Sequence, residues 1–165
     1  MALKGDRYEG MTDVSFFMND SSAAKGGVVV LSTGGSGVAL DQSKALVTYA
    51  ASASGNIPVG LLLNDMVNID QTRQHINFHK NEVQKGGKVT VLTQGWVVTD
   101  MITGTPTAGA PAYLTAAGKV TPTQSATGGV VATPPVGRFL STKDEDGYAK
   151  VSLNLPALPN NGNGN

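Results

Sequence analysis

Cysteine is absent from the 165-residue chain, which excludes disulfides, thiol nucleophiles, zinc ribbons and iron–sulfur clusters. Aromatic residues make up only 5% of the chain and charged residues 15%, and twelve basic side chains balance twelve acidic ones. A chain without net charge has no general attraction to nucleic acid or to an anionic membrane, so we expect neither as a partner. No apolar run approaches the roughly 20 residues that span a bilayer, and the N-terminus lacks the apolar core of a secretory signal.

Valine, threonine and turn-forming residues are abundant instead. The chain contains 18 valines, 16 threonines, 21 glycines and 8 prolines. Because β-branched residues favour strands and glycine and proline favour turns, this composition predicts an all-β fold rather than a helical bundle. Short strand-like runs separated by glycine-rich loops follow one another along the chain, which is typical of a small β-barrel or sandwich.

We expect three parts in the chain: an extended N-terminal arm over residues 1–25, a β-barrel domain over 26–155 and a flexible C-terminal tail over 156–165. In the last run of the barrel domain, residues 149–155, apolar and polar side chains alternate. This alternation predicts a strand with one buried face and one face in water.

The arm is distinguished by its apolar centre. Residues 1–25 show little strand alternation and no helical stripe, yet Val14, Phe16, Phe17 and Met18 stand close together. Large apolar side chains of this kind need a surface to pack on. We therefore predict that these four residues contact another subunit or a partner protein.

Three local signals refine the barrel domain. Turns ending in glycine at residues 116–118 and 142–147 each separate two strand-like runs, and they predict hairpins. The stretch 41–51 is the best helix candidate, with Asp41 as its N-cap, but residues 47–49 fit a strand equally well.

A search for catalytic or metal-binding residues yields no site that we expect to be functional. His75 and His79 lack a third ligand and the glutamate of a zinc-protease motif, so we interpret them as surface side chains. The loop 34–37 has neither the lysine of a phosphate loop nor the glycine pattern of a nucleophile elbow. The three carboxylates of residues 144–146 fit a charged hairpin turn better than a weak cation site. We expect no catalytic residue, no cofactor and no metal.

Two other features are more typical of an interaction surface. Residues 73–88 form the most basic part of the chain, which we interpret as a solvated face or a patch that docks on an acidic protein. The only tryptophan, Trp96, lies in an apolar run and is predicted to anchor the core or a subunit interface. A carbohydrate-binding module using Trp96 and Tyr113 stays open as an alternative, as does a hydrolase with an unrecognised carboxylate pair.

Several segments, taken in their order along the chain, carry a family resemblance. They are PVGLLLND at 58–65, KNEVQKGGKVTV at 80–91 running into GWV at 95–97, GAPAYL at 109–114 closing on GKVT at 118–121, and PVGRFL at 135–140 followed by GYAKVSL at 147–153. Together they resemble the small head-decoration, or capsid cement, proteins of tailed bacteriophages, over about residues 26–155.

The resemblance implies a β-barrel or β-tulip domain with no enzymatic activity and no catalytic residues. It implies a structural protein that is assembled in the host cytoplasm and binds the major capsid protein on the outer surface of the head. It also implies a homo-oligomer, for which we favour a trimer. The alternative within the virion is a tail, collar or fibre-base protein.

Overall fold

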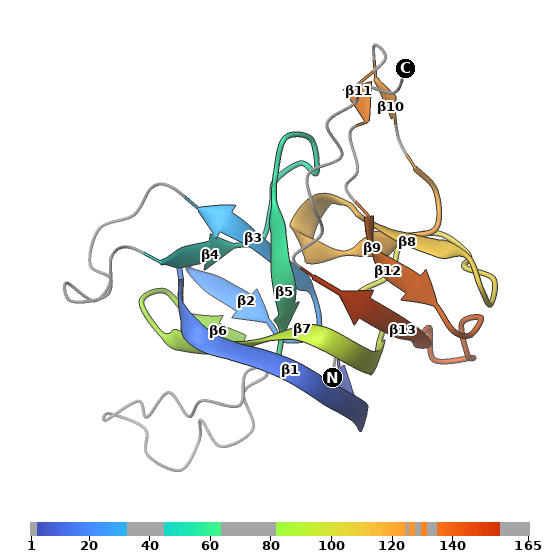
Figure 1. The fold of residues 1–165 in the computed structure, drawn as a ribbon, viewed down its shortest axis with the longest axis horizontal. Helices are drawn as coiled ribbons and strands as arrows, with labels where there is room; N and C mark the ends of the chain where they lie inside the picture. Colours follow the sequence, from blue (N-terminus) through green and yellow to red (C-terminus); the bar gives the residue numbers. More distant parts are fainter. Residues whose placement is uncertain are drawn as a thin grey trace.

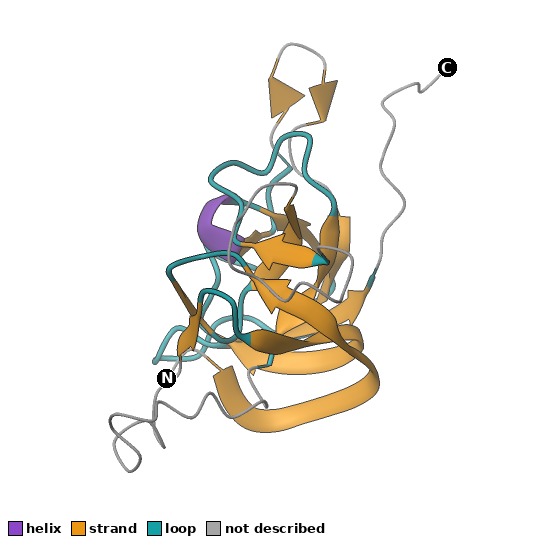
Figure 2. Ribbon diagram, turned by 90° about the vertical axis from the view of Figure 1, so that its left-hand side faces the viewer, coloured by secondary structure: helices purple, strands orange, loops and turns teal. Residues whose placement is uncertain are grey.

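The structure, a computed structural model, describes residues 3–32, 45–63, 82–124, 126–127, 130–131 and 135–155. Strands and loops make up nearly all of these residues (Figure 2). The all-β class predicted from the composition is therefore confirmed.

The described strands are numbered along the chain. They are β1 (Leu3–Met18), β2 (Ser22–Ala24), β3 (Val28–Ser32), β4 (Leu46–Thr48), β5 (Pro58–Leu62), β6 (Glu82–Gln84), β7 (Lys88–Thr99), β8 (Pro111–Leu114), β9 (Val120–Thr121), β10 (Ala126–Thr127), β11 (Val130–Val131), β12 (Pro135–Phe139) and β13 (Ala149–Asn154). A 3-10 turn, η2 (Ala116–Gly118), joins β8 to β9.

Five of these strands form a small closed barrel, as the sequence predicts. Their order is β1-β4-β3-β5-β7, and pairing between β7 and β1 closes the ring. β1 runs parallel to β4, whereas the other neighbours in the ring are antiparallel. The C-terminal part of β7 also pairs with β13, and the sheet continues through β12 and β8 to β9 (Figure 1). We call these last four strands the sheet extension.

Buried side chains form two hydrophobic clusters. One draws on every strand of the ring and on β2 and β6; its members are Met18, Ala23, Val29, Val47, Val59, Leu62, Val83, Val89 and Val91. The larger cluster joins β3, β5 and β7 to the four strands of the sheet extension, and Phe139 is its largest fully buried side chain. Because side chains alternate along a strand, β3 contributes to both clusters, with Val28 and Val30 in the larger one and Val29 in the other.

The N-terminal segment is built differently from a free arm. Its residues form β1, which pairs with β7 of the same chain from Leu3 to Phe17. The side chains of Phe17 and Met18 are buried, with exposed fractions of 8% and 0%. The register of β1 against β7 shifts at four places. These bulges break the alternation of buried and exposed residues, so the sequence pattern does not reveal the strand.

The two predicted hairpins are present. β8 and β9 pair antiparallel around η2, and β12 and β13 pair antiparallel across residues 140–148. Within the helix candidate 41–51, Leu46–Thr48 form β4, so the strand alternative holds there. Asp41 and the predicted tail 156–165 lie outside the described residues.

Polar contacts connect the segment between β1 and β3 to Thr48 and Tyr49 at the end of β4. The carboxylate of Asp20 accepts hydrogen bonds from Thr48 Oγ1 (2.5 Å) and from the backbone N–H of Tyr49 (2.7 Å). The Tyr49 hydroxyl donates to the carbonyl of Ala24 and accepts from the N–H of Gly27 at 3.2 Å. Burial raises the pKa of Tyr49 well above its usual range, so the hydroxyl stays protonated and remains a donor.

Candidate interaction surface

The candidate functional surface is the exposed side of one continuous sheet. This sheet consists of β1, β7 and the sheet extension. On β7, Trp96 lies between Gly95 and the fully buried Val97. Val97 pairs with Val151, which pairs with Phe139, and all three are completely buried. Because successive side chains of a strand point to opposite faces, Trp96 and the residues paired with it point outward.

Trp96 belongs to a row that crosses five strands. It pairs with Tyr8 of β1 on one side and with Ser152 of β13 on the other. Ser152 pairs with Arg138 of β12, and Arg138 pairs with Pro111 of β8. All five side chains are exposed or half-buried. Directly opposite residues on neighbouring strands have adjacent side chains, so the row is one continuous strip of surface.

Two shorter rows flank this strip. One contains Met11, Gln94 and Asn154, and the other contains Val98, Lys150 and Leu140. We call the eleven positions together the Trp96 face. Three of its large apolar side chains are exposed: Tyr8 at 59%, Met11 at 57% and Leu140 at 44%. Aromatic residues, methionine and arginine are enriched in protein–protein interfaces, so this composition is typical of a docking surface.

The charges on the Trp96 face are positive. The amino group of Lys150 lies 3.4 Å from the centre of the Trp96 ring. Arg138 Nη1 donates a hydrogen bond of 2.6 Å to the carbonyl of Gly109. The eleven positions include no carboxylate. Cation–π contact and hydrogen bonding hold both cations at the surface, so a partner that presents carboxylates beside apolar groups would complement this face.

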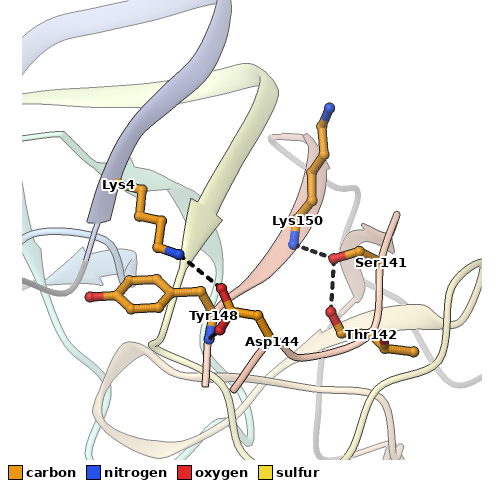
Figure 3. Close-up of polar contacts among 6 residues, drawn as sticks. All are labelled: Lys4, Ser141, Thr142, Asp144, Tyr148 and Lys150. Carbon is orange, nitrogen blue, oxygen red and sulfur yellow. Dashed lines mark hydrogen bonds and ion pairs between the residues drawn. The ribbon is translucent and has the colours of Figure 1, made fainter. Parts of the chain in front are cut away.

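Lys4, near the start of β1, is tied to the turn between β12 and β13 (Figure 3). Its Nζ lies 2.8 Å from Asp144 Oδ2 and 4.3 Å from the centre of the Tyr148 ring. The Lys4 hydrogen bond lowers the pKa of Asp144 below its ordinary value, and the same bond raises the pKa of Lys4. The backbone N–H of Tyr148 donates to Asp144 Oδ1 at 2.7 Å. Residues 144–146 thus lie in a charged hairpin turn, and its first carboxylate already binds an amine and an amide.

The interface residues predicted from the sequence fall into two groups. Val14 is 48% exposed, and Phe16 and Trp96 are half-buried, so a partner could reach these three. Phe17 and Met18 pack inside the chain. They could contact a partner only if β1 left the barrel, and so we retain Val14, Phe16 and Trp96 as the predicted contacts.

Trp96 and Tyr113, considered as a sugar platform, lie on strands that are not neighbours. β13 and β12 separate β7 from β8 in the sheet. At the usual strand spacing this places the two residues roughly 14 Å apart. Their rings therefore do not form one stacking platform.

Several sequence candidates, namely His75, His79 and the loop 34–37, lie outside the described residues, as does much of the basic region 73–88. Within the described parts of the chain, no three His, Asp or Glu side chains are grouped so that they could hold a metal ion. The same parts contain no helix with the length and apolar composition needed to cross a membrane.

Sequence reasoning missed most of the Trp96 face. The alternation in 149–155 does mark Lys150, Ser152 and Asn154 as outward-facing, and β13 confirms it. Tyr8 and Met11 have no comparable signal, because the register of β1 shifts on both sides of them. The lateral pairing of distant strands brings these residues together.

Comparison with known protein families matches the chain to one of them. A family model described as structural cement protein (E217 gp24/Pam3 gp6) matches residues 5–154, which is nearly the whole chain. No curated protein matches the chain.

Proposed function

The chain belongs to the phage structural cement proteins and is a structural virion protein, and from this we propose that it binds the outer surface of an assembled capsid and stabilises the shell. The partner in this proposal is the major capsid protein. The protein carries out no catalysis and needs no cofactor. It is assembled in the host cytoplasm, where completed heads offer the surface to which it binds.

The observation that carries the proposal is the Trp96 face. Tyr8 lies in the same row as Trp96, and the exposed Met11 and Leu140 lie in the two rows that flank it. Burying one large apolar side chain contributes about 1.5–3 kcal/mol. A few such contacts anchor each copy, and copies that are linked in an oligomer gain further affinity through avidity. Val14 and Phe16, farther along β1, extend the predicted contact.

Stabilisation follows from mass action. A protein that binds the assembled lattice, and not the dissociated capsid subunits, shifts the equilibrium towards the shell. Its own fold need not change, and no reaction is required. The trimer favoured from the sequence stays a prediction, which light scattering at high micromolar concentration can test.

Binding to heads that lack the protein tests the proposal, with two variants matched in chemistry. Leu140 on the Trp96 face and Ile57 just before β5 are exposed to nearly the same extent, 44% and 43%. We expect Leu140→Glu to weaken head binding about tenfold or more, because it replaces an exposed apolar side chain of the Trp96 face by a charge that would have to be buried against the partner. We expect Ile57→Glu to bind like the wild type.

Three outcomes of these binding experiments would contradict or change the proposal. Wild-type protein that does not bind heads at all contradicts the cementing function. Binding that Leu140→Glu leaves intact means that the capsid contact lies on another surface. Attachment to tails or collars in labelled particles favours the alternative virion component.

A further inference from the structure

Among the residues that the structure describes, one edge of β1 has no strand partner over most of its length. β1 pairs with β7 along one edge from Leu3 to Phe17. Along the other edge it pairs with β4 only at Phe17 and Met18. Within the described residues, the backbone of β1 before Phe17 therefore faces no strand on that side. Figure 1 shows β1 as the outermost strand beside β7.

An open edge of this length is a template for pairing with another chain, and monomeric proteins usually block such edges. The central part of β1 has no proline, and its most exposed large hydrophobic side chain is an aromatic one, Tyr8. The charges beside it alternate in sign, with Asp6, Arg7 and Glu9 in succession. Charged residues on an edge either prevent pairing or select one register, depending on what faces them.

We propose that β1 pairs antiparallel with β1 of a second copy of this chain, about a two-fold axis at Tyr8. In this register Arg7 faces Glu9 of the partner subunit, and Glu9 faces Arg7 of the partner subunit. Arg7 Nε and Glu9 Oε1 already form an ion pair within the chain. The four side chains of the dimer therefore form a group of alternating charge, which favours this register.

Neighbouring registers are less favourable for reasons present in the strand itself. Sliding the partner by two residues places Arg7 opposite the partner's Arg7, or Glu9 opposite the partner's Glu9, and like charges directly opposite are destabilising. Sliding by four residues centres the pair either on Gly10, where the register of β1 against β7 shifts, or on Asp6, where the carboxylates of the two copies would face each other. Arg7, Tyr8 and Glu9 pair with three consecutive residues of β7 and form the longest regular run of β1. The register centred on Tyr8 therefore pairs the most regular part of β1 with the same part of the second copy.

Pairing at Tyr8 also joins two Trp96 faces. Tyr8 pairs with Trp96 on its own β7 side, and in the dimer it faces the partner's Tyr8. The central row then runs without interruption through both copies and doubles in length. This two-fold contact by itself links two copies of the chain, whether or not a trimer forms.

Disulfide trapping tests the register, because the wild-type chain contains no cysteine. Directly opposite residues of antiparallel strands have Cα atoms about 4.5–5.5 Å apart, within the range of a disulfide. Tyr8→Cys under mild oxidation should give a covalent dimer on a non-reducing gel. Gly5→Cys is the matched control, since a Cβ there meets nothing within 4 Å. In the proposed dimer, the two copies of residue 5 are about 20 Å apart along the strands, so we expect no cross-link.

A charge swap tests the same contact without cysteines. Glu9→Arg should weaken self-association about tenfold or more in sedimentation velocity, because like charges then face each other at two places. Adding Arg7→Glu restores opposite charges and should restore the dimer. The proposal is overturned if Tyr8→Cys stays monomeric, if Gly5→Cys cross-links equally well, or if the double variant associates no better than Glu9→Arg. Melting curves verify that each variant is folded.

Discussion

Replacing Gly95 by alanine should loosen β1 from the barrel. Gly95 has φ +148°, and an added Cβ would lie 2.0 Å from the carbonyl oxygen of Tyr8. The backbone of Gly95 fixes the position of the added Cβ, and the oxygen it meets belongs to the backbone of β1, so one of the two strands must move. The unusual φ costs about 1–3 kcal/mol. Separating the strands at this point loses about two hydrogen bonds, at ~1 kcal/mol each.

Together these effects predict a loss of about 3–5 kcal/mol in the free energy of unfolding. For a chain of this size, that corresponds to a fall of roughly 6–20 °C in Tm. Differential scanning calorimetry measures the fall, and hydrogen exchange should show faster exchange in β1 and in the facing part of β7 than elsewhere.

Gly147→Ala is the control that separates backbone strain from collision. Gly147 has φ +87°, but an added Cβ meets nothing within 4 Å. It should cost only about 1–2 kcal/mol, the penalty of the left-handed backbone. Equal losses of Tm for Gly95→Ala and Gly147→Ala would refute the close contact between β1 and β7.

Three further variants test other parts of the structure. Phe139→Ala removes the largest side chain of the larger core and should lower the free energy of unfolding by about 3–5 kcal/mol in urea titrations. Tyr49→Phe leaves two backbone groups near β2 without their hydroxyl partner and should cost about 1–3 kcal/mol by the same measurement. Because the Lys4 hydrogen bond lowers the pKa of Asp144, the stability that this pair contributes is present above pH 3.8 and is lost as the pH falls through the lowered pKa. In Lys4→Met, the NMR titration midpoint of the Asp144 carboxyl should move up towards its ordinary value.

The regular parts of the fold could be read from the sequence because their signals are local. In residues 149–155 every second side chain is apolar, and β13 buries Ala149, Val151 and Leu153 in that order. The glycine-ended turns likewise predict the two hairpins, since a turn and its flanking strands are neighbours along the chain.

β1 could not be predicted in this way because its pairing is irregular and distant. Phe17 and Met18 do show in the sequence as side chains that need a partner. Burial alone does not say whether that partner is another molecule or the same chain some 70 residues later. In the structure it is the same chain, since Phe17 pairs with Lys88 and Met18 packs in the ring.

The Trp96 face depends on the same long-range pairing. Of the contact residues predicted from the sequence, only Trp96 lies within this face. Its neighbours Tyr8 and Ser152 come from opposite ends of the chain, and only the strand order β1-β7-β13 brings them beside it. No local pattern encodes that order.

The most direct test of the central claim is a cryo-electron microscopy reconstruction of heads assembled with this protein. The account predicts density for the chain at repeated positions on the outer surface of the head, with the Trp96 face against the major capsid protein. Heads whose outer surface carries no density for the chain, despite its presence in the particles, would contradict it.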